Sequence, residues 1–392
     1  MKRLFSKALA LFLILAVALT GQTVWSFAAG NIIQINEPER IISIINDPTQ
    51  TYTNLSAMSF ADNANCLYTV KVADTGTNSN GYFYYYPDID DDSNYRQFFI
   101  QFVGHANGMT VTSQYIYILA LSQTENNTSS PIGSNEAATQ NKIIQIPRSF
   151  IHNLPNGSTI SPSNYTIITA KHYNGSVLQD YNQALGNITR YNNNNSFIVN
   201  YHLSGVTGGF AFTIARLQTV NGNTEFIVSE DHDDIFIVRN LLPDTYLTHP
   251  DIAYSTTCGL FIPKWYGGKK KVGDEYVINE QYYNPCKNVV LWAKMVDGVY
   301  TNKKVGGIWY KEYIPDKIVV NVSNLMVGNI PKYTKFEIEG TAIDHYKENE
   351  GQPNEVEKAD LLFSVNVNST LSAHKADGIF RVKRTGTDSF VV

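Results

Sequence analysis

The sequence contains few cysteines and almost no helical pattern. Three of its 392 residues are cysteines, Cys66, Cys258 and Cys286, and an odd number cannot all pair within one chain. Cys258 and Cys286 precede two apolar segments that we expect to pair as antiparallel strands, which places them about 20 Å apart at opposite ends of the pair. A disulfide needs Cα atoms within about 7 Å, so we predict none, and the spacing matches no zinc-binding pattern.

Neither positive nor negative charge is in large excess. The net charge is −5 over 392 residues, and the composition indicates no basic face for a nucleic-acid backbone. We therefore predict no nucleic-acid partner. The motifs GxSxG, HExxH, the Walker loop and GxGxxG at a strand–helix junction are absent, so no motif names a reaction.

The N-terminal apolar run, residues 8–20, is too short for a membrane span. It has 13 residues, whereas a spanning helix needs about 20. Lys2, Arg3 and Lys7 precede it, and small residues at positions 26 and 28 follow it, which is typical of a secretory signal peptide. We predict a signal peptide at 1–28, a single domain at 29–392, and a secreted, extracellular protein with no membrane span after cleavage. An uncleaved anchor is the alternative.

What the sequence has instead is a recurring strand pattern. Residues 104–121 hold a polar cluster, a short apolar run, a polar turn and a second apolar run, which is typical of two antiparallel strands joined by a tight turn. Weaker copies begin at NLSAMSF, ALGNITR, HPDIAY and EIEGTAI. In each copy, small or polar residues lead into a strand, and a second strand follows.

These five units predict an all-β fold, a single β-propeller with five blades. Small sheets that cannot bury both faces alone stack around a common axis, and small residues such as Gly108 and Gly340 suit the crowding there. The segment 226–238 has the pattern of an extra hairpin, which would make six blades. We expect the strand at 31–35 to join the last unit beside residues 378–383. A pair of β-sandwich domains is the alternative fold.

The first residues of the inner strands are unusually polar, and a propeller brings them to one mouth of its channel. The candidate ligand-binding residues are His105, Asn107, His249, Asp251, Glu337 and Glu339. Such a set can bind a polyhydroxylated ligand, or place an acid and a base across a glycosidic bond. We expect either no cofactor or a divalent cation in the central channel. The alternative is that these residues only satisfy backbone groups and hold channel water.

Two acidic turns are weaker candidates for a metal site. Residues 88–94 alternate oxygen-bearing side chains, but Ser93 and Phe99 stand where an EF-hand needs Gly and Glu, so we expect a solvated turn. Residues 230–234, EDHDD, are expected at a polar hairpin tip, with a surface metal site as the less favoured interpretation.

Three stretches resemble secreted bacterial β-propellers, and most of all helveticin J-like bacteriocin proteins: HANGMTVTSQYIYILAL, HPDIAYSTTCGLFIP, and EIEGTAI with ADLLFSV. The resemblance implies a protein of a Gram-positive bacterium that acts at a cell surface, and it carries over no catalytic residue. Five-bladed glycoside hydrolases share the architecture, but their widely spaced Asp/Asp/Glu set is not clearly readable here. We expect a monomer that binds a polysaccharide or cell-surface glycan. A glycoside hydrolase or lyase that uses the same carboxylates is the alternative.

Overall fold

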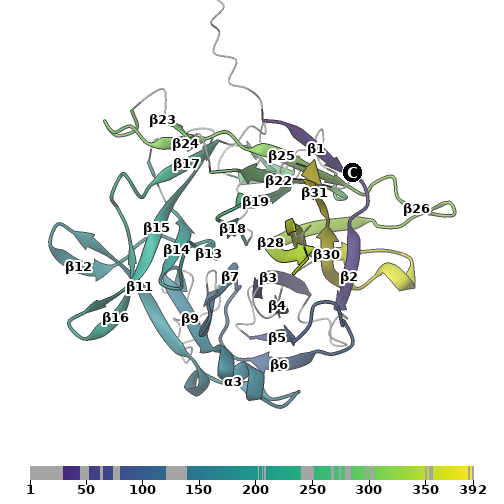
Figure 1. Ribbon diagram of the computed structural model, residues 1–392, viewed down its shortest axis with the longest axis horizontal. Helices are drawn as coiled ribbons and strands as arrows, with labels where there is room; N and C mark the ends of the chain where they lie inside the picture. The colour runs from purple at the N-terminus through teal and green to yellow at the C-terminus, as the bar shows by residue number, and fades with distance from the viewer. Residues whose placement is uncertain are drawn as a thin grey trace, which may run out of the picture.

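The chain is all-β in the computed structural model, as the strand pattern predicts (Figure 1). The described residues are 30–44, 53–61, 65–73, 80–120, and most of 139–239, 251–295 and 298–390. The predicted signal peptide therefore lies outside them. Among the described residues, the longest helix is α3 (Arg148–Asn153), and no helix has the length and apolarity needed to cross a membrane.

Three of the sheets are built from four or five strands each. The β3 sheet has the order β10 (Thr159–Ile160), β6 (Arg96–Ile100), β5 (Gly81–Tyr86), β4 (Cys66–Val72), β3 (Asn54–Ala61). The β18 sheet has the order β1 (Ile32–Ile35), β25 (Asp316–Asn321), β22 (Lys287–Ala293), β19 (Gly259–Trp265), β18 (Ala253–Ser255). The β28 sheet has the order β2 (Glu39–Ile44), β30 (Asp377–Val382), β29 (Val356–Asn368), β28 (Lys335–Glu348).

A fourth, curled sheet has twelve strands. One part contains β7 (Gly108–Val111), β8 (Tyr115–Leu119), β9 (Lys142–Pro147), β11 (Thr166–Asn174) and β12 (Val177–Asp180). The other contains β13 (Ile188–Arg190), β14 (Ser196–Asn200), β15 (Gly209–Val220), β16 (Asn223–Val228), β17 (Phe236–Arg239), β23 (Val299–Tyr300) and β24 (Lys311–Tyr313). A short parallel pairing of β11 with β16 joins the two parts. Separate hairpins are β20 (Lys269–Val272) with β21 (Glu275–Ile278), β26 (Met326–Val327) with β27 (Ile330–Pro331), and β31 (Arg384–Gly386) with β32 (Ser389–Phe390).

Five strands at the inner ends of these sheets lie near the middle of the molecule in Figure 1: β3, β7, β13, β18 and β28. β3 contacts β7 and β28, β13 contacts β7 and β18, and β18 contacts β28. All eight residues of β3 are buried. Glycine allows the closest approach, because a Cβ on Gly108 would lie 3.1 Å from Asn187 Cα, and one on Gly340 would lie 3.2 Å from Asp251 Cβ.

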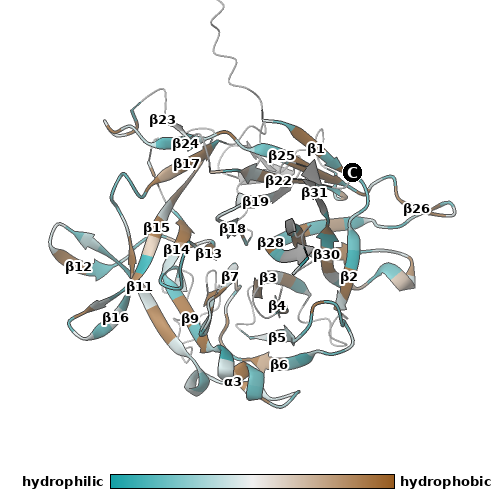
Figure 2. Ribbon diagram, viewed as in Figure 1, coloured by the Kyte–Doolittle hydropathy of each residue, from teal (hydrophilic) through white to brown (hydrophobic). Residues whose placement is uncertain are grey.

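Apolar side chains fill the spaces between neighbouring sheets. Leu55 and Leu67 of the β3 sheet share one core with Leu362 and Ile379 of the β28 sheet. Another core lies between the β18 and β28 sheets, where the rings of Phe261 and Trp292 are stacked with centroids 5.6 Å apart. Strands such as β9 and β17 are largely brown in Figure 2 because they contribute to such cores.

The N-terminal strand joins a different sheet from the one we expected. Residues 31–35 do not lie beside 378–383; β1 instead pairs in parallel with β25, with Ile33 opposite Ile318. It is β2 that pairs with β30, antiparallel. The burial pattern explains the difference, because Ile42 of β2 is fully buried whereas Ile32 of β1 is 62% exposed.

The predicted hairpin at 226–238 is also wrong. Its two apolar segments belong to β16 and β17, and both pair antiparallel with β15, at 215–220 and at 209–212. The polar residues 229–234 therefore lie in a loop between two strands that pair with the same neighbour, β15. This pairing removes the observation that suggested a sixth blade.

The cysteines are buried free thiols, all three within the described chain. The predicted antiparallel pairing of the segments after Cys258 and Cys286 is confirmed, since Leu260 lies opposite Ala293 and Trp265 opposite Asn288. The two cysteines precede opposite ends of this pair. The thiol of Cys286 instead donates a hydrogen bond to the carbonyl of Tyr333, 3.4 Å away.

Candidate functional site

Asp251 lies where three inner strands approach one another. Its side chain is fully buried, and its two carboxylate oxygens accept hydrogen bonds from the backbone N–H groups of Met58 on β3 (3.0 Å) and Met109 on β7 (3.1 Å). Its own backbone N–H donates to the carbonyl of Glu339 on β28 (2.9 Å). Burial raises the pKa of the Asp251 carboxyl well above its ordinary value, and the backbone hydrogen bonds partly oppose this. Asp251 thus connects β3, β7 and β28, which belong to three different predicted units.

Glu337 and Glu339 form an acid pair on one side of β28. They are two residues apart, so their side chains leave the strand on the same side, while Phe336 and Ile338 enter the core. Lys335 forms an ion pair with Glu337. Burial raises the pKa of the Glu339 carboxyl well above its usual range, and the neighbouring Glu337 raises it further, while Lys335 opposes them. Two carboxyl groups this close share a proton more readily than both ionise.

Asn366 connects this acid pair to the first sheet. It lies opposite Glu337 in the β28–β29 pairing, and its side-chain amide donates to Glu339 Oε1 (3.2 Å) and to Asn54 Oδ1. Its Oδ1 accepts a hydrogen bond from the backbone N–H of Leu55 (2.8 Å). The amide is therefore held on both sides and fixes the position of Glu339. Sequence analysis missed Asn366 because it lies on a second strand, and only first strands carry the repeated polar pattern.

His105 and Asn107 are both half-buried in the segment that leads into β7. The backbone carbonyl of His105 accepts a hydrogen bond from the hydroxyl of Ser56, 2.7 Å away. Ser56 lies at the irregularity between Leu55 and Ala57 in the β3–β4 pairing, where a bulge turns its side chain toward the neighbouring unit. His105 is thereby attached to the first strand of the β3 sheet.

The third unit contributes a buried amide. Asn187 is 5% exposed, and its Oδ1 has no hydrogen-bond partner among the residues that the structure describes. Asn187 also lies directly beside Gly108, the first residue of β7. His249, the remaining predicted site residue, lies outside the described residues.

The described residues of the predicted set thus approach one another through backbone contacts as well as side chains. Hydrogen bonds lead from the His105 carbonyl to Ser56, from the adjacent Leu55 to Asn366, and from Asn366 to Glu339. We use the name entry cluster for His105, Asn54, Asn366, Glu337 and Glu339. Glu339 and His105 are half-buried, whereas Asn54, Asn366 and Glu337 are buried behind them.

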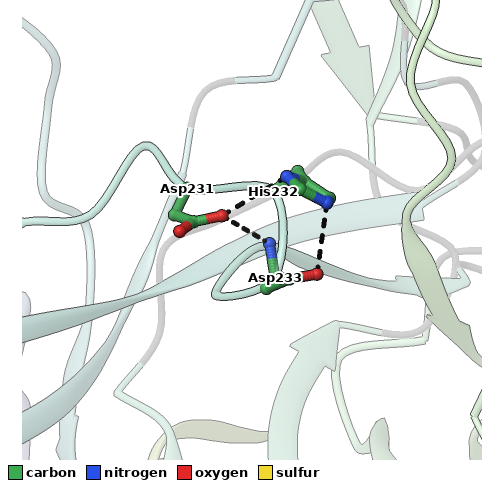
Figure 3. A group of neighbouring side chains, drawn as sticks. All are labelled: Asp231, His232 and Asp233. Carbon is green, nitrogen blue, oxygen red and sulfur yellow. Dashed lines mark hydrogen bonds and ion pairs between the residues drawn. The ribbon is translucent and has the colours of Figure 1, made fainter.

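The exposed acidic turn lies at a different place. Asp231, His232 and Asp233 are in the loop between β16 and β17, and Figure 3 shows the imidazole between the two carboxylates. His232 Nδ1 is 3.3 Å from Asp231, and Nε2 is 3.2 Å from Asp233. The Asp231 carboxylate also accepts the backbone N–H of Asp233, which is an ordinary turn-stabilising bond. These contacts within the turn explain the positions of the three side chains.

No family model matches the sequence, and no curated protein matches it. Solved structures with some likeness include an α-L-arabinofuranosidase from Lactobacillus brevis, with 10% identity and a TM-score of 0.40 over 87% of this chain and 96% of that chain. A polysaccharide lyase has 6% identity and a TM-score of 0.32 over 91% and 96%. An α-L-arabinofuranosidase from Podospora anserina has 8% identity and a TM-score of 0.32 over 89% and 96%. Likeness at this level establishes neither the fold nor an activity of this chain.

Proposed function

We propose that residues 29–392 form a single five-bladed β-propeller. The contacts of β3, β7, β13, β18 and β28 with one another support this architecture, and so do the apolar cores between successive sheets. In this proposal the curled twelve-stranded sheet supplies two blades, and β2 completes the last blade from the N-terminal side. Two β-sandwiches would place the first and last sheets apart, whereas here these sheets share a core.

We further propose that the entry cluster binds a polysaccharide or a cell-surface glycan. The observation that carries this proposal is the half-buried residue Glu339, whose carboxyl group accepts a hydrogen bond from Asn366. Sugar hydroxyls both donate and accept hydrogen bonds, and a carboxyl group held beside fixed amides matches them. His105 and Asn107 extend the polar surface. Asp251 has both carboxylate oxygens occupied by backbone groups, so its role in the proposal is to position the strands.

The test is a glycan array probed with the purified protein and with Glu339→Gln. A hydrogen bond to a neutral group contributes about 0.5–1.5 kcal/mol, so the variant should bind the captured glycans roughly 2- to 10-fold more weakly. His105→Ala tests the other side of the cluster. Asp233→Asn is the matched control, because it removes an exposed carboxylate in the β16–β17 loop. Equal binding by wild type and Glu339→Gln would exclude this site.

Catalysis is the second candidate, and the acid pair is the observation that favours it. A carboxyl group with a raised pKa can act as a general acid. The geometry of the pair argues against a standard glycosidase, whose two carboxyl groups lie about 5–9.5 Å apart, because Glu337 and Glu339 are hydrogen-bonded to each other. A reducing-end assay with a polysaccharide panel separates the two candidates. Product formation that Glu339→Gln abolishes would make the protein an enzyme.

We propose that binding requires no metal ion. Lys335 already neutralises Glu337, which leaves the cluster little excess negative charge for a divalent cation. The array is repeated with EDTA and with added CaCl₂. Unchanged binding supports a cation-free site, and loss of binding in EDTA would place a cation in the channel.

The proposed site suits a secreted protein. Export is tested by expression in a Gram-positive host, where the mature protein should appear in the medium and begin at Ala29. Retention in the membrane fraction with an intact N-terminus would instead identify an uncleaved anchor.

A further inference from the structure

A polar cavity lies further along the inner strands than the entry cluster and Asp251. Its volume is about 50 Å³, and residues of β3, β7, β13, β18 and β28 line it. Along β28 the cluster residues Glu337 and Glu339 come before the lining residues, which begin at Thr341. The same order holds on β3, where Asn54 precedes Met58. We use the name exit cavity for this space.

The charge of the exit cavity is positive. Its lining includes Arg190 and His345 together with several hydroxyl groups, and it includes no aspartate or glutamate. Two buried acids adjoin the lining residues in sequence: Asp251, whose carboxylate is already bound to two backbone N–H groups, and Asp344, which pairs with Arg381 at 3.2 Å. No lining residue therefore offers the Arg190 guanidinium a carboxylate partner.

Two threonines in the lining each accept a backbone hydrogen bond through the side-chain oxygen. Thr110 Oγ1 accepts the backbone N–H of Arg190 (2.9 Å), and Thr189 Oγ1 accepts that of Tyr254 (3.2 Å). Both threonines are more than nine-tenths buried. A hydroxyl has one hydrogen to donate in addition to the bonds that it accepts. Within the described parts of the chain, no acceptor is found for either hydroxyl hydrogen, so both remain for a ligand.

The size of the cavity limits what it can hold. A bound water needs about 10–15 Å³ of such space, so the exit cavity has room for roughly three to five waters. A tetrahedral oxyanion, with four oxygens around one atom, is of this size. A sugar ring is larger, and the cavity is therefore distinct in ligand class from the entry cluster.

We propose that the exit cavity binds a small oxyanion, phosphate or sulfate or an equivalent terminal group, through the Arg190 guanidinium and the hydroxyls of Thr110 and Thr189. Arginine forms charge-assisted, often paired, hydrogen bonds with such groups. The hydroxyls complete the donor set from β7 and β13. The site is formed only when the inner strands are assembled, so the ligand stabilises the folded protein.

The experiment is a calorimetric titration of the full mature protein with inorganic phosphate at constant ionic strength. Wild type should bind saturably, and Arg190→Ala and Arg190→Glu should bind at least tenfold more weakly. Arg190 is exposed, so neither change disturbs a core. Lys375→Ala removes an exposed positive charge outside the cavity and should match wild type.

Parallel titrations with sulfate and with methyl phosphate distinguish a free ion from a terminal group on a larger molecule. Binding of methyl phosphate as tight as that of phosphate indicates a monoester, and weaker binding indicates the free ion. Absence of saturable binding to wild type, or equal affinity in Arg190→Ala, overturns the proposal. Glu339→Gln should leave phosphate binding unchanged, so the proposed glycan site and the proposed oxyanion site can be refuted separately.

Discussion

Lys71 and Asp377 form a buried ion pair although 306 positions separate them in the sequence. Lys71 Nζ lies 2.6 Å from Asp377 Oδ2, and the two side chains are 0% and 4% exposed. The other carboxylate oxygen accepts the backbone N–H of Val367 (2.7 Å). The pair connects β4 of the first sheet to β30 of the last one. Burial raises the pKa of the Asp377 carboxyl, and Lys71 opposes that change.

Removal of the lysine should be strongly destabilising. Lys71→Met leaves the Asp377 carboxylate buried without its cation, which costs about 3–5 kcal/mol in unfolding free energy. Urea denaturation measures the loss. The double variant Lys71→Met/Asp377→Asn removes both charges and should recover part of the stability. A single variant within about 1 kcal/mol of wild type would show that the pair does not hold the first and last sheets together.

Any substitution of Asp251 that removes a hydrogen-bond acceptor should destabilise the folded protein. Asp251→Ala leaves the N–H groups of Met58 and Met109 buried without partners, at about 1–3 kcal/mol for each unsatisfied group. Asp251→Asn keeps one acceptor and turns an amide donor toward the other N–H, so its cost should be intermediate. In thermal and urea unfolding, wild type should be the most stable, Asp251→Asn intermediate and Asp251→Ala the least stable. A neutral Ala variant would contradict the strand-positioning role.

Because of Asp344, the free energy of unfolding should decrease as the pH rises from about 4 to 6. Burial raises the pKa of Asp344 to about 6, against the opposing effect of Arg381. The native state therefore holds a proton that the unfolded chain has already released, and the stability from this group is present at low pH and is lost as the pH passes the native pKa. The upper limit of the effect is about 3 kcal/mol. Asp344→Asn should lack this slope in urea titrations across the range; an identical slope would exclude Asp344 as its source.

Glu339→Gln should lose binding without losing stability. The raised pKa of the Glu339 carboxyl means that ionising it inside the cluster is unfavourable, so wild-type stability from this group is lost as the pH rises. The glutamine variant avoids that loss and should be more stable than wild type at pH 8 by roughly 1 kcal/mol. Differential scanning calorimetry at pH 5 and pH 8 measures the difference. A variant that is less stable at both values would indicate a structural role for the carboxyl.

The strands of the chain were largely predictable because their alternation is local. The two strands predicted within residues 104–121 are β7 (Gly108–Val111) and β8 (Tyr115–Leu119), and a short turn separates them as expected. Pairings that depend on competition between distant strands were not predictable. The exchange of roles between β1 and β2 depends on whether Ile42 or Ile32 fits a core to which Leu362 and Ile379, from the other end of the chain, contribute.

The candidate site was predictable only where the repeated unit marks it. Glu337, Glu339, His105 and Asp251 stand at first strands, and the pattern places them near one another. Asn366 and the Lys71–Asp377 pair lie on later strands, where no repeat distinguishes a functional polar residue from a surface one. Their partners are set by how the first and last sheets meet, and a single sequence does not encode that contact in any local spacing.

The dissociation constant of the best-bound oligosaccharide from the array, measured by calorimetry for wild type and Glu339→Gln, tests the central claim most directly. We predict roughly 2- to 10-fold weaker binding for the variant, with an unchanged constant for Asp233→Asn. The same constant for wild type and Glu339→Gln would contradict a glycan site at the entry cluster.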